Sequence, residues 1–329
     1  NPKKPIGSFM FLGPTGVGKC HGKGTKVLMY DGSIKNVEDI LVGELLMGDD
    51  STPRTVLSLA RGKDQMYEIT PNKGGDTFTC NESHILSLKN TTTKKIINIS
   101  IKEYLEKSKW FKHTHKLYSV GVDFTKKDIK IDPYFLGLWL GDGISKRVGV
   151  TTADKEIVDY IESFVNKLNT KKVLVSDLDD EITEEYSVSI HLHENNKSNT
   201  YYVSTGMKGG QSCLLRKDFK HYNLLDNKHI PFDYLTSGVE DRKMLLSGII
   251  DSDGYMYHKC YEIVQKNKKL SDDIVYLSRS LGYCTSIKEK FVDGELYYRI
   301  YISGDLSDLP LLLERKKSQK RKQKKDVLV

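Results

Sequence analysis

One unit of sequence occurs twice in this chain. The apolar stretch YFLGLWLGDG, residues 134–143, is followed by the strand-like VGVTT and by DKEIVDYIESFVNKLN, whose apolar residues fall on one helical face. The stretch LLSGIIDSDG, residues 245–254, is followed in the same order by YEIVQ and LSDDIVYLSRSLG. The aspartates near the ends of the two stretches, Asp142 and Asp253, are 111 residues apart. Such a repeat predicts two similar half-domains packed about a pseudo-twofold axis.

Small residues four positions apart mark one face of each repeated apolar helix. They are Gly137 and Gly141 in the first copy, and Gly248 and Ser252 in the second. Because small side chains let two helices approach closely, we expect these helices to pack against each other. Their C-terminal ends would then lie together.

Each predicted helix ends in an aspartate before a glycine, at Asp142 and Asp253. A carboxylate at a helix C-terminus meets the negative end of the helix dipole, which costs up to about 1 kcal/mol, and two neighbouring carboxylates repel further. A divalent cation such as Mg²⁺ relieves both effects, and metals beside paired carboxylates commonly cut phosphodiesters. A single Asp-Gly pair would favour a simple turn. Two copies after matching helices favour a metal site.

The two motifs resemble the paired LAGLIDADG motifs of double-motif homing endonucleases. The resemblance implies an α+β endonuclease domain of two pseudo-symmetric halves over about residues 131–315. It implies a monomer that cuts a double-stranded DNA target in the presence of Mg²⁺. Asp142 and Asp253 would be its metal-binding acids.

The same resemblance implies two active-site lysines. NKHIP, residues 227–231, resembles the segment that supplies the first, which would be Lys228. RKK, residues 315–317, resembles the segment that supplies the second, for which we predict Lys317, with Lys316 as the competing register. The alternative for each lysine is a solvated surface charge.

A phosphate-binding loop near the N-terminus stops one residue short. In GPTGVGKC, residues 13–20, Gly13, Gly18 and Lys19 have the spacing of a P-loop, in which the next residue is a serine or threonine that holds Mg²⁺. Here the next residue is Cys20. Turn signals and strand-like runs follow, where a P-loop would open into a helix.

From Cys20 to about residue 90, short strand-like runs such as TKVLMY, MYEIT and HILSL alternate with turn signals. This alternation predicts a compact all-β unit. Residues 91–130 are rich in lysine and predict a connector or a small attached region, with Trp110 as its apolar anchor.

The stretch that begins CHGKGTKVLMYDG resembles the N-terminal splicing block of inteins, and FTCNESHIL, residues 78–86, resembles their second block. The resemblance is close to the inteins of fungal vacuolar ATPases. It implies an all-β, horseshoe-shaped Hint splicing domain, with the endonuclease inserted in it. The Hint domain would span residues 20–130 and resume within the basic stretch 316–329, where a strand would begin near Val327.

Protein splicing gives each matching residue a role and needs no cofactor. Cys20 would attack the carbonyl carbon of Lys19 and form a thioester, since a thiol is a good nucleophile near neutral pH. His84 would protonate the departing amide nitrogen, and Asn81 would polarise or strain the amide by hydrogen bonding. Taken alone, Cys20 could be a small buried hydrophobe and His84 a core histidine. Their order before a LAGLIDADG pair favours the catalytic roles.

Residues 1–19 resemble the end of a host segment, or extein, from the P-loop of a Clp-type AAA+ ATPase. The partners would then be this extein and the intein-free host gene as DNA target. The final splicing blocks do not occur before the last residues, KKDVLV, so we expect thioester formation without complete splicing. The alternative is a truncated or split-intein fragment that retains only DNA cleavage. An ATPase fragment is disfavoured, because no apolar run ending in Asp-Glu follows the P-loop.

Composition limits the kinds of partner and the cellular locations that this sequence fits. The chain of 329 residues carries a net charge of +7, which mildly favours an anionic partner. Its five cysteines form no C-x-x-C pair, which argues against a disulfide scaffold and a zinc module. No apolar run reaches the roughly 18 residues of a membrane span. We therefore expect a cytoplasmic protein, with access to the nucleus if the source is eukaryotic, and no membrane partner.

Overall fold

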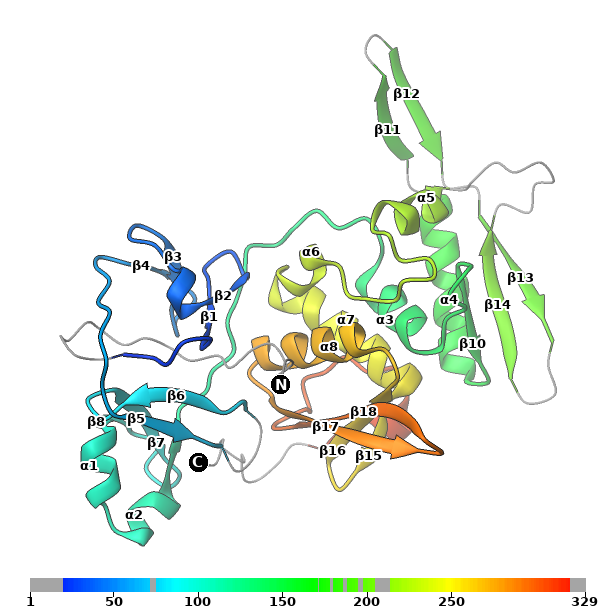
Figure 1. Cartoon of the computed structure of the whole chain (residues 1–329). Coiled ribbons are helices and arrows are strands. Elements are labelled where there is room, and N and C mark those ends of the chain that lie inside the picture. Colours follow the sequence, from blue (N-terminus) through cyan, green and yellow to red (C-terminus); the bar gives the residue numbers. More distant parts are fainter. Residues whose placement is uncertain are drawn as a thin grey trace.

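The computed structural model describes residues 20–71, 75–170, 172–177, 180–185, 188–194, 198–204 and 214–319. Figure 1 shows the early segments, in blue and cyan, on one side of the later segments, in green to red. The predicted P-loop residues Gly13, Gly18 and Lys19 lie outside the described residues. The strand predicted to begin near Val327 also lies outside them.

The early part is built from short antiparallel strands. They pair as β1–β2, β3–β4 and β5–β6, and as the three-stranded sheet β8-β7-β9. Apart from the 3₁₀ turn η1 (Val37–Asp39), the described residues between Cys20 and Asn90 form no helix, which confirms the predicted all-β unit. The strands are β1 (Lys26–Leu28), β2 (Ile34–Asn36), β3 (Leu45–Met47), β4 (Pro53–Thr55), β5 (Met66–Ile69), β6 (Phe78–Asn81), β7 (Ile85–Asn90), β8 (Ile96–Ser100) and β9 (His115–Leu117).

Two short helices, α1 (Ile101–Glu106) and α2 (Lys109–Thr114), stand where we predicted a lysine-rich connector. The predicted anchor, Trp110, is wrong, because its side chain is 71% exposed. Phe111 packs instead against the cluster around the β7 strand and stacks on the His115 ring, with 4.0 Å between centroids. Adjacent helical residues point about 100° apart, so one face of a short helix cannot bury both.

The later part repeats the order of helix, strand and helix that the sequence predicts. Its sheets are β10-β14-β13 and β15-β16-β18-β17, and β11–β12 forms a hairpin that projects from the rest in Figure 1. The elements are α3 (Pro133–Asp142), β10 (Gly149–Thr152), α4 (Lys155–Asn169), β11 (Lys172–Asp177), β12 (Asp180–Glu185), β13 (Ser189–His193), β14 (Asn199–Ser204), α5 (Leu214–His221), α6 (Phe232–Leu235), α7 (Val239–Asp253), β15 (Tyr255–Tyr257), β16 (Cys260–Gln265), α8 (Lys268–Ser280), β17 (Cys284–Val292), β18 (Glu295–Ser303) and η2 (Glu314–Lys316).

The predicted apolar faces are buried in one large core. Helix α4 buries Ile157, Ile161 and Phe164 on one face, as its pattern predicts. Helix α8 is buried all round, because it also faces the early part of the chain: the Tyr276 hydroxyl donates to the Gly32 carbonyl at 2.7 Å. The turn at Gly32 requires glycine, because its φ is +87° and an added Cβ would stand 2.2 Å from the Thr236 side chain.

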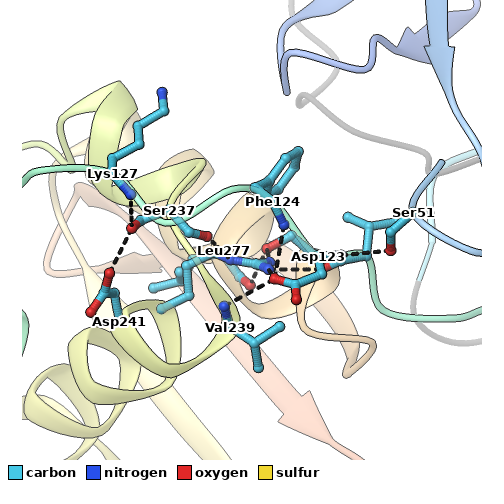
Figure 2. A network of polar contacts seen from close by, with 11 residues as sticks. Ser51, Asp123, Phe124, Lys127, Ser237, Val239, Asp241 and Leu277 are labelled. Carbon is cyan, nitrogen blue, oxygen red and sulfur yellow. Dashed lines mark hydrogen bonds and ion pairs between the residues drawn. The ribbon is translucent and has the colours of Figure 1, made fainter. Parts of the chain in front are cut away.

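The connector before α3 is fixed by a polar network (Figure 2). The Asp123 backbone N–H donates to Ser51 Oγ at 2.8 Å, and Asp123 Oδ1 accepts from the Val239 backbone N–H at 3.1 Å. The fully buried Arg242 donates to the Val122 carbonyl at 2.7 Å and pairs with Asp123 at 3.5 Å. A second link joins Arg279 of α8 to Asp76, with one nitrogen–oxygen distance of 2.8 Å. These contacts hold the two parts of the chain together.

None of the helices in the described ranges combines the length and the apolar composition that crossing a membrane requires.

Candidate active sites

Asn81, at the end of β6, holds Cys20 through two hydrogen bonds. The Cys20 backbone N–H donates to Asn81 Oδ1 at 3.0 Å, and the Asn81 backbone N–H donates to the Cys20 carbonyl at 3.0 Å. The Asn81 side chain is buried, whereas Cys20 is half-buried. The structure thus brings together two of the residues predicted from the splicing blocks. The bonded N–H belongs to the peptide bond between Lys19 and Cys20.

Asp64 fixes the orientation of that asparagine, and sequence reasoning missed it. The Asn81 Nδ2 group donates to Asp64 Oδ2 at 2.8 Å, so Oδ1 is the atom that faces Cys20. This bond, with a second from the Gln65 backbone N–H, holds the pKa of Asp64 below its usual range. Asp64 precedes β5 in a stretch without a motif, so no local signal identifies it.

His84 lies in the turn between β6 and β7, three residues after Asn81. Its backbone N–H donates to the Asn81 carbonyl at 3.1 Å, and its side chain is 5% exposed. The imidazole of His21 lies against it, with ring centroids 4.3 Å apart and planes inclined by 58°. Burial, with repulsion from His84, lowers the pKa of His21 to about 3, so His21 is neutral near neutral pH. Sequence reasoning missed this partner, although it follows Cys20 directly.

The second site lies at the ends of helices α3 and α7, which pack as closely as their small residues predict. A Cβ on Gly137 would stand 2.3 Å from the Leu245 carbonyl oxygen, and one on Gly248 would stand 2.2 Å from that of Tyr134. A Cβ on Gly141 would stand 2.0 Å from Ser252 Oγ. The two C-terminal ends therefore meet.

Asp142 and Asp253 stand at these adjoining ends. Partial burial raises the pKa of Asp142 above its usual range, and the positive charges of Lys316 and Lys228 oppose this rise. The residue is still exposed to solvent. Burial, with repulsion from Asp142, raises the pKa of Asp253 to about 6. The Gln265 amide donates to Asp253 Oδ2 and opposes this rise. Gln265 is the last residue of the strand-like YEIVQ, which follows the second repeated helix. This position is the sequence signal that could have identified it.

The donors at this site suit a hard divalent cation. Both side-chain donors are carboxylates, whose mutual repulsion a cation would relieve, and oxygen is the ligand atom that Mg²⁺ prefers. Among the described residues, no group of three or more His, Cys, Asp or Glu side chains forms a metal site. Mg²⁺ is usually held by one or two carboxylates together with waters and substrate oxygens, which fits this pair.

Lys228 caps the first helix. Its Nζ donates to the carbonyl groups of Leu140 and Gly141, each at 3.1 Å. Burial lowers the pKa of Lys228 to about 8, and the negative charges of Asp142 and Asp253 oppose this fall. The Asn267 amide donates to the Lys228 carbonyl at 2.8 Å and so fixes the segment that carries this lysine.

Lys316, rather than the predicted Lys317, takes the matching position on the second helix. Its Nζ donates to the carbonyl groups of Ile250 and Asp251 at 2.9 and 2.8 Å. Lys317 is exposed and pairs with Glu314. The structure therefore places the competing register at the site, because the single turn η2 directs only one of the consecutive cations toward α7.

Two family models match separate segments of the chain. Residues 20–131 match the family model "Hom_end-associated Hint", and residues 229–328 match the family model "Homing endonuclease". One segment of the chain is thus similar to a Hint domain and another is similar to a homing endonuclease. The first repeated helix and Asp142 lie between the two matched segments.

Curated relatives of the Hint and homing endonuclease domains are much longer proteins. The replicative DNA helicase DnaB of Mycobacterium intracellulare is 28% identical over 174 residues, 53% of this chain and 23% of the helicase. The catalytic subunit of the V-type proton ATPase of Candida tropicalis is 40% identical over 86 residues, 23% of this chain and 8% of that protein. The homothallic switching endonuclease of Saccharomyces cerevisiae is 27% identical over 192 residues, 52% of this chain and 31% of that endonuclease. The chain thus spans less than a third of each.

Among solved structures, that of I-DmoI in complex with DNA and Mn is similar to this chain, with 16% sequence identity and a TM-score of 0.37. The similar part covers 52% of this chain and 88% of the I-DmoI chain.

Proposed function

We propose that this chain is an intein with two activities: an acyl shift at Cys20 and site-specific cleavage of double-stranded DNA. One observation carries the proposal. The segment that matches the Hint model contains the site around Cys20 and Asn81, and the segment that matches the homing endonuclease model supplies α7 and Lys316, which form the second site together with α3. The two sites need different substrates, so each activity can be tested without the other.

In the acyl shift, the Cys20 thiol sulfur forms a bond to the carbonyl carbon of Lys19. The bond between that carbon and the Cys20 nitrogen breaks, and the thiol proton is balanced by the proton that the nitrogen gains. The product is a thioester and a free amino group on Cys20. No cofactor takes part.

Asn81 holds the nitrogen that must leave. Its Oδ1 accepts the Cys20 N–H, which fixes the orientation of the scissile amide, and Asp64 keeps the amide group of Asn81 in place. His84, in the adjoining turn, serves as the general acid for the nitrogen, since imidazole is the side chain whose ordinary pKa lies closest to neutral pH.

In the endonuclease, Asp142 and Asp253 would hold divalent metal, Mg²⁺ by preference, against the two DNA strands. When bound, the metal supplies an activated water and stabilises the charge that develops on the scissile phosphates. Lys228 and Lys316 lie at the ends of different helices, so we assign one to each strand. Each lysine stabilises the developing negative charge on its phosphate.

The DNA target would be the host gene at the point where the intein is absent. Residues 1–19 suggest that this host is a Clp-type AAA+ ATPase whose P-loop the intein interrupts, so the host would be inactive until splicing. We expect a monomer, because one chain supplies both halves of the endonuclease site. The setting would be cytoplasmic, with access to the nucleus in a eukaryote.

Two assays on one preparation test the proposal. Dithiothreitol should release residues 1–19 from the chain, and Cys20→Ala should prevent that release. Mg²⁺ should support cleavage of a long duplex that spans the intein-free site, and Cys20→Ala should leave cleavage unchanged. If the wild-type chain releases no peptide in any thiol, the splicing half of the proposal fails. If it cuts no such duplex, the endonuclease half fails.

A further inference from the structure

A buried carboxylate outside the proposed metal site joins the two repeated helices to the segment that carries Lys316. Asp251, in α7, is 1% exposed. Its Oδ2 atom accepts hydrogen bonds from the Tyr134 hydroxyl of α3 and from the Leu312 backbone N–H, each at 2.7 Å. Leu312 lies four residues before Lys316.

This bond acts on the same segment as the bonds of Lys316 itself. The Lys316 Nζ donates to the Asp251 main-chain carbonyl at 2.8 Å, and the Tyr261 hydroxyl donates to the Lys316 carbonyl. The side chain of Asp251 therefore fixes the start of the segment, while its main chain receives the lysine at the other end. A shift of Leu312 would move the amine away from the helix end.

The first half of the repeat has no carboxylate at this position. The residue that corresponds to Asp251, 111 positions earlier, is Leu140, which is 1% exposed. A leucine thus fits a buried position at the same point of the matching helix. A buried carboxylate near a helix C-terminus is costly, so its presence in α7 points to the bonds that it makes.

The segment of Lys228 is fixed by a different carboxylate. Asp273, in α8, is 4% exposed and its Oδ2 accepts the Ile230 backbone N–H at 3.1 Å. Ile230 lies two residues after Lys228. The other oxygen of Asp273 accepts from Lys269 of the same helix. Each lysine-bearing segment is therefore bound through its backbone by one buried carboxylate. The carboxylate comes from α7 for the Lys316 segment and from α8 for the Lys228 segment.

We propose that Asp251 and Asp273 are positioning residues, Asp251 for Lys316 and Asp273 for Lys228, and that each governs cleavage of one DNA strand. This inference rests on the proposed endonuclease activity. Misplacing a catalytic group by about 1 Å can cost roughly 10²-fold in rate. Loss of either carboxylate should therefore slow cleavage of one DNA strand and leave cleavage of the other strand unchanged. The enzyme would then release nicked DNA.

The experiment follows each strand of a target duplex separately, with a different fluorophore at each 5′ end, at saturating enzyme. Asp251→Leu should slow one strand by roughly 10²-fold, and Asp273→Leu should slow the opposite strand by a similar factor. DNA affinity should stay within about twofold of wild type, because neither side chain faces the exposed surface.

A double variant separates positioning from a general loss of structure. Lys316→Met should slow the same strand as Asp251→Leu, and the two changes together should be no slower than Lys316→Met alone, since both act through one amine. Asp251→Leu combined with Lys228→Met should instead slow both strands. Equal slowing of both strands by Asp251→Leu, or a double variant slower than Lys316→Met, would overturn the inference.

A milder variant keeps the test decisive if Asp251→Leu does not fold. Tyr134→Phe removes one of the two hydrogen bonds to Asp251 Oδ2, together with the contact of the Tyr134 hydroxyl with the Leu312 backbone N–H. It should slow the strand that Lys316→Met slows, by several-fold, and leave the other strand unchanged. Unbiased slowing would contradict the proposal. A wild-type chain that cuts neither strand would instead remove the proposed endonuclease activity on which the inference rests.

Discussion

Lys228 and Lys316 are 88 residues apart in the sequence and hold matching positions on the two repeated helices. Each Nζ donates to consecutive carbonyl groups in a helix's last turn, Leu140 and Gly141 for Lys228, Ile250 and Asp251 for Lys316. The carbonyl ends of the helices, which would otherwise repel the DNA phosphates, are thus each covered by a cation.

The first prediction concerns the register of the second lysine. Lys316→Met should slow DNA cleavage by roughly 10²-fold or more, because it removes a cation from a partly buried site. Lys317→Met, its neighbour, should change the rate by less than about twofold, because an exposed ion pair contributes little. A cleavage time course at fixed salt compares them. The opposite ranking would restore the register that the sequence predicted.

The second prediction separates cutting from binding. Asp142→Asn or Asp253→Asn should slow cleavage by roughly 10³-fold, since each change removes a carboxylate from a metal site worth several kcal/mol of transition-state stabilisation. DNA affinity should stay level or rise, because a negative charge beside the phosphates is lost. Gel-shift titrations beside cleavage time courses measure both. Joint loss of binding and cutting would indicate an aspartate that serves the fold.

The sequence predicts well what depends on local periodicity. The helices α4 and α8 follow from apolar spacing, and the approach of α3 to α7 follows from small residues four positions apart. The grouping of Asp142 and Asp253 then follows from packing, because each ends one of the two helices. These features need no knowledge of distant contacts.

What the sequence does not predict depends on distant contacts or on a single turn. Asp64 acts through a bond to a residue 17 positions away, and nothing in its own neighbourhood marks it. In the RKK stretch, the direction that η2 gives the chain decides which of the two lysines points to α7. Trp110 and Phe111 show the same limit, since either could anchor a two-turn helix until the sheet beneath it is known.

The third prediction tests how Asn81 holds Cys20. Asn81→Ala should slow dithiothreitol release of residues 1–19 by roughly 10²-fold, because it removes the acceptor that fixes the scissile amide. Asp64→Ala should slow it by less, since the amide of Asn81 remains but can rotate. Asp64→Asn, which keeps an acceptor for Asn81 Nδ2, is the matched control. Mass spectrometry of the released peptide gives the rates. Unchanged release in Asn81→Ala would exclude the proposed role.

The fourth prediction concerns the helix pair. Gly248→Ala should lower the free energy of unfolding of the endonuclease domain by about 3 kcal/mol or more, because the new Cβ would stand 2.2 Å from the Tyr134 carbonyl oxygen, a backbone atom. Gly62→Ala is the control, since a Cβ there meets nothing within 4 Å. Thermal unfolding should show a lower midpoint for the first variant alone. Equal midpoints would mean that the helices can separate without cost.

The fifth prediction concerns the pH dependence of Hint domain stability. The pKa of His21 is lowered to about 3 in the folded chain by burial and by repulsion from His84. In the unfolded chain it should be near the ordinary value of about 6.5, so between these two values the unfolded state binds a proton that the folded state does not. The stability that His21 contributes as a neutral side chain is therefore complete above about pH 6.5 and is lost as the pH falls toward 3, by at most about 1.4 kcal/mol per pH unit.

His21→Phe keeps an aromatic ring beside His84 but cannot take up a proton, so it isolates this effect. Urea unfolding of both proteins at several pH values between 7 and 4 should show a steeper loss of stability for the wild-type chain, and the difference between the two curves should grow as the pH falls. Titratable groups that do not interact with His21 cancel in that difference. Parallel curves would mean that His21 accepts a proton in the folded chain, and thus that the ring contact with His84 at 4.3 Å opens at low pH.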